Sequence, residues 1–160
     1  MSREHLYRAK RADWRELPKE EWWVEGALFE GKENSYIFTN VKVTDKWENS
    51  EIGADAIGYL VDPETACEYT GLTGKSGRKI FEGDIARKMV SVYKLRESAP
   101  CGERMLIGSV IWDNSSLLYP GHWALKSEDE HGNDATYTFD NKYEVIGNIF
   151  DNPELLQNNQ

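Results

Sequence analysis

The sequence predicts a mainly β fold, either all-β or a β-dominated α+β fold. Three observations support this: short segments alternate apolar and polar residues with a period of two, polar turn residues separate these segments, and helix signals are scarce. Of the 160 residues, 39% are apolar and 12% are aromatic. This content can build the core of one domain, or of a main domain with a smaller appendage, and it argues against disorder of the whole chain. A series of about ten short strands favours small barrels.

The N-terminal half contains five segments expected to be strands. The first is rich in strand formers and stops at a glycine, and the second follows after a short polar turn, as in a hairpin. In the third, Val41, Val43 and Trp47 share one face, which indicates a half-buried strand. The fourth ends at Asp62-Pro63, because proline fixes φ and cannot donate to a strand ladder. The expected strands are residues 22–29, 35–39, 41–47, 56–61 and 66–70, and one helical turn is expected within residues 18–23.

The C-terminal half repeats the pattern. Residues 105–112 form the most apolar run and are expected to be a central strand. Residues 96–103 contain serine, proline and glycine, which predicts a loop. Asp140-Asn141 is a tight-turn signal between the last two strands and predicts a hairpin there. The expected strands are residues 85–95, 105–112, 122–126, 136–139 and 143–150.

The least strand-like stretch of the middle, residues 70–83, divides the chain into two parts. We therefore expect an N-terminal β unit over residues 1–70 and a small C-terminal β-barrel over residues 71–156. The barrel unit ends in a short helical turn, in which Asn152 is the expected cap and Pro153 takes the first helical position. Residues 157–160 are expected to be a disordered tail.

The segment TGLTGKSG at residues 70–77 suggests a phosphate-binding loop, but its spacing is wrong. The motif G-x-x-x-x-G-K-[ST] would need a glycine at position 69, which is Tyr69, and a helix should follow. The sequence instead predicts a pair of tight turns in which Gly71, Gly74 and Gly77 supply positive φ angles.

No group of residues predicts an enzyme, a metal site or a cofactor. Cys67 and Cys101 are too few for a disulfide framework and are expected to be reduced thiols, with Cys67 half-buried. The acids and histidines of residues 122–131 match no spacing of metal ligands. A nucleophile–histidine pair assembled in space stays open, because spacing in the sequence does not exclude it.

The charge of −9 is unevenly distributed. Residues 1–19 carry six Lys or Arg against three Asp or Glu, and residues 75–104 carry eight against four. The second zone lies among aromatic residues, as in modules that bind single-stranded nucleic acid, so residues 69–94 are the alternative binding site. Solvated surface cations and core rings explain the same pattern and are the favoured interpretation. The candidate binding residues are Tyr69, Lys75, Arg78, Lys79, Arg87 and Lys88.

Two long motifs resemble those of the YopX-like family of phage and prophage proteins. They read YTGLTGKSGRKIFEGDI at residues 69–85 and YEVIGNIFDNPELL at residues 143–156, and residues 7–11 (YRAKR) resemble the N-terminal pattern of the same family. The resemblance implies an origin in a bacteriophage or prophage but no established activity. We therefore expect a non-enzymatic accessory protein that acts by binding in the bacterial cytoplasm. No apolar run is long enough to cross a membrane, and the N-terminus lacks a signal-peptide core.

The order of elements after the GDI motif resembles the opening of an SH3-like barrel. In such a barrel Gly83-Asp84 would turn the chain into the first strand, and Asp84 would accept hydrogen bonds from turn amides. Residues 145–149 would be the closing strand, with Gly147 at a kink or a close approach of strands.

The density of large rings in the N-terminal half predicts an interface. Trp22 and Trp23 should point to opposite faces if their segment is a strand, so one ring needs a second apolar neighbour. That neighbour is either the barrel or another copy of the chain, and an open β unit also leaves edges that another chain can pair with. The candidate interface residues are Trp14, Trp22 and Trp23, and the expected partner is a second copy or another protein.

Overall fold

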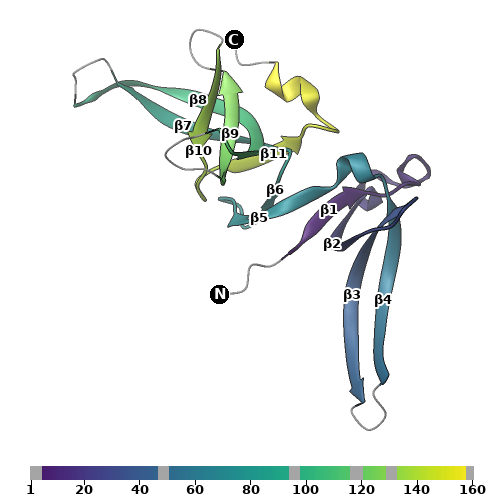
Figure 1. Cartoon of the computed structure of the whole chain (residues 1–160). Coiled ribbons are helices and arrows are strands. Elements are labelled where there is room, and N and C mark those ends of the chain that lie inside the picture. Colours follow the sequence, from purple (N-terminus) through teal and green to yellow (C-terminus); the bar gives the residue numbers. More distant parts are fainter. Residues whose placement is uncertain (1–4, 47–50, 94–97, 116–120, 129–132, 158–160) are drawn as a thin grey trace. The chain divides into compact units, whose positions relative to one another are not determined.

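The computed structural model describes residues 5–46, 51–93, 98–115, 121–128 and 133–157, with only the backbone described for 43–46 and 51–55. It divides into two compact units, residues 1–69 and 70–160. Nearly all regular structure is antiparallel strand, and the helical elements are single 3₁₀ turns, so the mainly β prediction is confirmed (Figure 1). In the described part of the chain, no helix combines the length and apolar character needed to cross a membrane.

The first unit is built on strands in the order β4-β3-β2-β1-β5. The last of these, β5, contains the boundary between the units and pairs with β6 beyond it. A bridge between Arg11, just after β1, and Val61, at the end of β4, connects the first and the last strand of β4-β3-β2-β1. These four strands therefore form a curled sheet. The elements are β1 (Tyr7–Lys10), η1 (Trp14–Glu16), η2 (Lys19–Glu21), β2 (Trp23–Glu30), β3 (Ser35–Lys46), β4 (Glu51–Val61), η4 (Pro63–Thr65) and β5 (Cys67–Thr73).

The core of the first unit lies on the inner face of this curled sheet. Ala9, Ile37 and Val61 are buried there, and half-buried apolar side chains from β1, β2 and β4 pack around them. Gly26 of β2 fits this tight curl because a Cβ atom at its position would lie 2.1 Å from the Phe38 carbonyl oxygen. The outer face of the same strands therefore carries the remaining large side chains.

The second unit contains a five-stranded antiparallel sheet in the order β10-β9-β8-β7-β11. The most apolar run falls in β8, which is the central strand as predicted. β7 and β8 extend together beyond β11 as a two-stranded hairpin (Figure 1). The elements are β6 (Lys79–Phe81), β7 (Asp84–Tyr93), β8 (Pro100–Asp113), β9 (His122–Glu128), β10 (Asp134–Thr138), β11 (Glu144–Asn148) and η5 (Pro153–Leu156).

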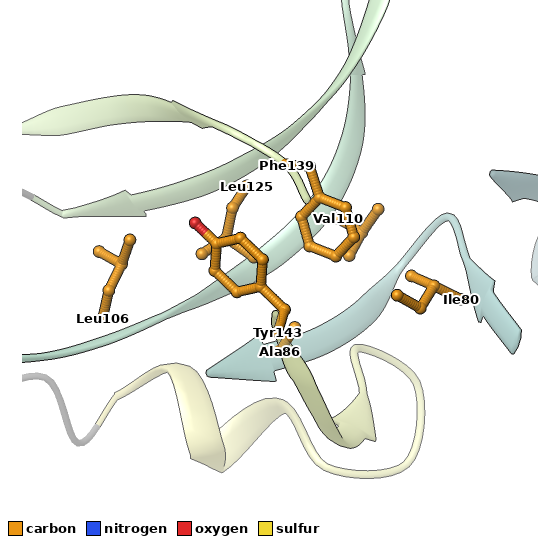
Figure 2. Packing of buried hydrophobic residues seen from close by; sticks show 7 residues of the cluster. All are labelled: Ile80, Ala86, Leu106, Val110, Leu125, Phe139 and Tyr143. Atoms are coloured by element: carbon orange, nitrogen blue, oxygen red, sulfur yellow. The ribbon is translucent and has the colours of Figure 1, made fainter. Parts of the chain in front are cut away.

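The core of the second unit gathers around Tyr143 and Phe139, whose rings stack at 4.6 Å between centroids (Figure 2). Both rings lie in the connection between β10 and β11, which are the two edges of the sheet. Because the connection joins the two edge strands, the sheet curls around the aromatic pair. Burial, with smaller contributions from Asp140 and Tyr137, raises the pKa of Tyr143 to about 12. The finer prediction of an SH3-like barrel stays a prediction.

Several expected elements differ from the structure. Residues 136–139 and 143–150 do not form a hairpin, because β10 pairs with β9 and β11 pairs with β7. Part of the loop expected at residues 96–103 is strand, since β8 begins at Pro100 and pairs with β7. Residues 35–39 and 41–47 are not separate strands but one strand, β3, with a bulge near Asn40, whose φ is 53°. Val41 is exposed there, and Trp47 lies outside the described residues.

The glycine turns were predicted in part. Gly71 and Gly77 have positive φ, but Gly74 does not. A Cβ atom placed at Gly74 would lie 3.0 Å from the Tyr143 carbonyl oxygen, so the close approach of this backbone favours glycine there. Gly83 has a φ of 74°, and the Phe81 N–H donates to the fully buried Asp84 at 2.9 Å, which confirms the turn into β7.

The predictions for the end of the chain and for the thiols had mixed outcomes. Gly147 lies at a bulge of β11, as expected. Asn152 precedes η5 but its side chain makes no capping hydrogen bond. Cys67 is fully rather than half buried, and its thiol donates to the Thr65 carbonyl at 3.2 Å.

Candidate functional site

The three tryptophans expected at an interface surround a lysine of their own chain. Lys10, at the end of β1, is buried, and its Nζ lies over all three rings. The distances to the centroids are 4.2 Å for Trp14, 4.8 Å for Trp22 and 5.5 Å for Trp23. An ammonium ion over an aromatic face is attracted by the ring quadrupole, so this tryptophan cluster (Trp14, Trp22 and Trp23) is held by Lys10.

The condition under which Trp22 and Trp23 were expected to point to opposite faces, that both lie in one strand, is not met. Trp22 ends η2 with helical backbone angles, and β2 begins only at Trp23, so the alternation of a strand does not apply between them. The Trp22 indole N–H also donates to the Leu17 carbonyl at 3.0 Å, which fixes the ring beside Trp14. All three rings remain half-exposed, and whether they contact a partner stays a prediction.

Another apolar surface lies on the outer face of β2, β3 and β4. Phe29 pairs with Tyr36, and Tyr36 pairs with Leu60, so these side chains point to one side of the sheet. Phe38 lies next along β3, and its ring covers Gly58. Phe29 is 59% exposed and Leu60 43%. We call these four large side chains, Phe29, Tyr36, Phe38 and Leu60, the outer aromatic face.

The hairpin of β3 and β4 extends past this face as a two-stranded arm. β2 pairs with β3 only from Ser35 to Phe38, whereas β3 and β4 stay paired to Lys46 and Glu51 (Figure 1). A depression of about 690 Å³ lies at the base of the arm, where the exposed side chains of Val41 and Ile57 contribute to its lining. A two-stranded ribbon buries little apolar surface by itself, so the arm has apolar side chains to offer a partner.

In the second unit, basic residues from three segments line a depression of about 490 Å³. Arg87, Lys88 and Met89 come from β7, Met105 from β8, and Lys75 from the turn before β6. The remaining lining residues come from the start of β11 and the turn before it, and are Asn141, Lys142 and Glu144. We call this the basic depression.

Two of its cations are paired with carboxylates. Arg87 donates to Glu144 at 3.0 Å, and this hydrogen bond and charge hold the pKa of the Glu144 carboxyl below its usual value. Lys88 donates to Asp140 at 2.7 Å. Burial acts to raise the pKa of Asp140, but the hydrogen bonds and charges of Lys88 and Lys142 outweigh it, so the pKa is lowered.

The structure brings together only part of the predicted nucleic-acid site. Lys75, Arg87 and Lys88 line the same depression, whereas Arg78 and Lys79 do not. Tyr69 is buried in the first unit and offers no ring to the depression. Lys142 was missed because it lies far along the chain, within a turn assigned to a hairpin. Met89 and Met105 were missed because the sequence predicted only that their segments are strands, and their neighbours depend on the pairing of β7 with β8.

The metal candidates of residues 122–131 fall only partly within the structure. Asp129 and His131 lie outside the described residues. Elsewhere in the described chain, no three His, Cys, Asp or Glu side chains are grouped closely enough to hold a metal ion.

Nearly the whole chain matches one family model. The model is that of the YopX protein, and the match covers residues 7–157. The chain belongs to the YopX family. The crystal structure of protein EF1440 from Enterococcus faecalis is similar in fold, with a TM-score of 0.51, 20% identity, and coverage of 95% of this chain and 96% of that one. A comparison with curated proteins finds no match.

Proposed function

We propose that this YopX family member is a non-enzymatic accessory protein that acts by binding, and that its principal partner is a second copy of itself. The observation that carries the proposal is the outer aromatic face, where Phe29 and Leu60 are exposed beside two further rings on one side of the first sheet. Contiguous apolar surface of this kind is typical of interaction sites, whereas single exposed apolar residues are not.

The edge strand beside this face favours a second copy as the partner. β4 pairs with β3 along its length, and its other edge is met by described residues only near Leu60 and Val61. Of the eleven residues of β4, only Glu51 and Asp55 are charged, and both lie in the arm; the part beside the outer aromatic face has no charge and no proline to protect its edge. Two copies related by a two-fold axis would pack their outer aromatic faces against each other, which buries Phe29 and Leu60 of both copies and brings the uncovered edges of β4 to the rim of the contact.

Light scattering on matched variants tests this proposal. Phe29→Ser combined with Leu60→Ser removes the exposed part of the face, and we expect it to weaken self-association by at least about tenfold. Tyr93→Ser combined with Met105→Ser is the matched control, since these residues are similarly exposed on strands of the second unit. A chain that is monomeric without substitution, or equal weakening by both pairs, would contradict the proposed interface.

The origin in a phage or prophage belongs to the same proposal. It is supported by the family match and would be tested by the genes that flank this one. Structural or lysis genes of a phage on both sides are expected, and an isolated metabolic setting would argue against it.

A further inference from the structure

The basic depression lies along an open strand edge. Arg87, Lys88 and Met89 are consecutive in β7 and direct their side chains to alternate faces. A depression that touches all three therefore includes the edge of the strand, in addition to the face on which Met89 pairs with Met105. β11 pairs with this edge only from Asp84 to Arg87, and no described strand pairs with it from Lys88 to Tyr93.

The depression begins where β11 begins. Glu144 is the first residue of β11 and is opposite Arg87, and Asn141 and Lys142 lie just before it. An extended segment placed beside residues 88–93 would thus continue the line of β11. Along such an edge, alternate residues direct both their N–H and C=O groups outward, which offers a ready set of hydrogen bonds to an added strand.

The charges of the depression favour an acidic segment. Four cations of the described chain line it, together with one carboxylate, Glu144, which is paired with Arg87. Asp140, outside the lining, is paired with Lys88. Lys75 and Lys142 are exposed, and their charges act only at longer range on these two carboxylates, which are already paired. Both ammonium groups are therefore accessible to a bound carboxylate. This excess of positive charge stands out on a chain whose net charge is −9.

The apolar part of the lining favours a peptide over a nucleic acid. Met89 and Met105 pair across β7 and β8 and are about half exposed, and thioether side chains adapt to varied apolar partners. Among the residues that the structure describes, no aromatic ring lines the depression, so stacking of bases, which contributes much of single-strand binding, has no platform there.

We propose that the basic depression binds an acidic peptide segment in extended conformation, which adds as a strand to the open edge of β7 and places its carboxylates near Lys75 and Lys142. The site lies within the second unit and does not depend on the self-association proposed above.

Fluorescence anisotropy on the full chain tests the site with three labelled probes. These are a peptide of alternating threonine and glutamate, its threonine–lysine counterpart, and oligothymidine. We expect saturable binding of the glutamate peptide only. Combining Lys75→Gln with Lys142→Gln should weaken it about fivefold to tenfold, as for two exposed ion pairs. Arg78→Gln is the matched control: Arg78 is an exposed cation close in sequence that does not line the depression, and it should change binding less than about twofold.

Amide hydrogen exchange locates the bound peptide. Slower exchange of alternate residues within 88–93 is expected on adding the glutamate peptide. The proposal is overturned if neither peptide binds, if the lysine peptide binds equally well, or if protection appears elsewhere. Binding of oligothymidine, lost in the Lys75 and Lys142 variant, without binding of the glutamate peptide would overturn it in favour of a nucleic-acid site. Equal urea midpoints of all variants show that the fold is kept.

Discussion

Replacing Gly83 with valine should destabilise the second unit strongly. Gly83 has a φ of 74°, in the left-handed region that glycine adopts freely and a β-branched residue does not. Its N–H donates to the Val110 carbonyl and its own carbonyl accepts from Ile149, each at 2.9 Å, so the backbone is fixed on both sides and cannot relax.

The magnitude has two parts. The left-handed conformation costs roughly 1–2 kcal/mol for a residue with a Cβ atom. That Cβ atom would lie 3.3 Å from Ile149 Cδ1 and 3.5 Å from the Phe150 ring, so the two Cγ atoms of valine crowd a packed site at a further cost of roughly 1–3 kcal/mol. We expect the free energy of unfolding to fall by about 2–5 kcal/mol, and Gly83→Ala to show mainly the first part.

Urea unfolding followed through the indole N–H resonances of Trp112 and Trp123 isolates the second unit, since the rings of the tryptophan cluster report the first. With an m-value of about 2 kcal/mol per molar urea, the midpoint should drop by about 1–2.5 M. Gly102→Val is the matched control, because Gly102 lies in β8 with an ordinary φ, and a Cβ atom at its position would meet no neighbour within 4 Å. Lys75→Ala, at an exposed side chain, should also leave the midpoint unchanged. Equal midpoints for Gly83→Val and these controls would refute the turn argument.

Three further predictions concern buried or paired polar groups of the second unit. Asp84→Ala should lower the stability by roughly 1–3 kcal/mol in thermal unfolding, because the buried N–H of Phe81 loses its acceptor. Asp140→Asn should reduce stability at pH 7 but not well below pH 3.8, the ordinary pKa of the carboxyl. Because folding lowers the pKa of Asp140, its carboxylate stabilises the fold above the pKa of the unfolded chain, and this stabilisation is lost as the pH falls through the pKa of the folded chain. Absorbance titration should show one tyrosine that ionises only near pH 12 and whose signal is missing in Tyr143→Phe. Ionisation of the Tyr143 hydroxyl at about pH 10 would show that the ring is not buried.

Features set by neighbouring residues were predictable from the sequence. The Gly83-Asp84 turn depends on a glycine and on a carboxylate three residues from the amide it binds, and it appears as expected. The central place of β8 agrees with the prediction from its apolar run, in which Leu106 and Val110 are buried, whereas Met105 and Trp112 at the ends of the run are exposed.

Features set by distant pairing were not predictable in the same way. Asp140-Asn141 does form a turn, but the turn joins two opposite edges of a curled sheet, and local turn chemistry is the same in both cases. The positions of Trp22 and Trp23 depended on whether a strand begins one residue earlier or later, and that boundary decides whether the rings diverge or converge on Lys10.

The candidate sites also combine residues that are close in sequence with residues that only strand pairing brings together. Lys75, Arg87 and Lys88 were found from their charge and closeness in sequence. Lys142 joins them only through the pairing of β11 with β7. The outer aromatic face required the register of three strands, because an isolated Phe29 or Leu60 in the sequence resembles any core residue.

Sedimentation equilibrium of the unmodified full chain tests the central claim, self-association through the first unit, most directly. The chain has a mass of 18.4 kDa. Over concentrations from about 1 to 100 µM, the range in which a moderately stable dimer forms, the average mass should rise toward twice this value. A mass of 18.4 kDa at every concentration would contradict the account.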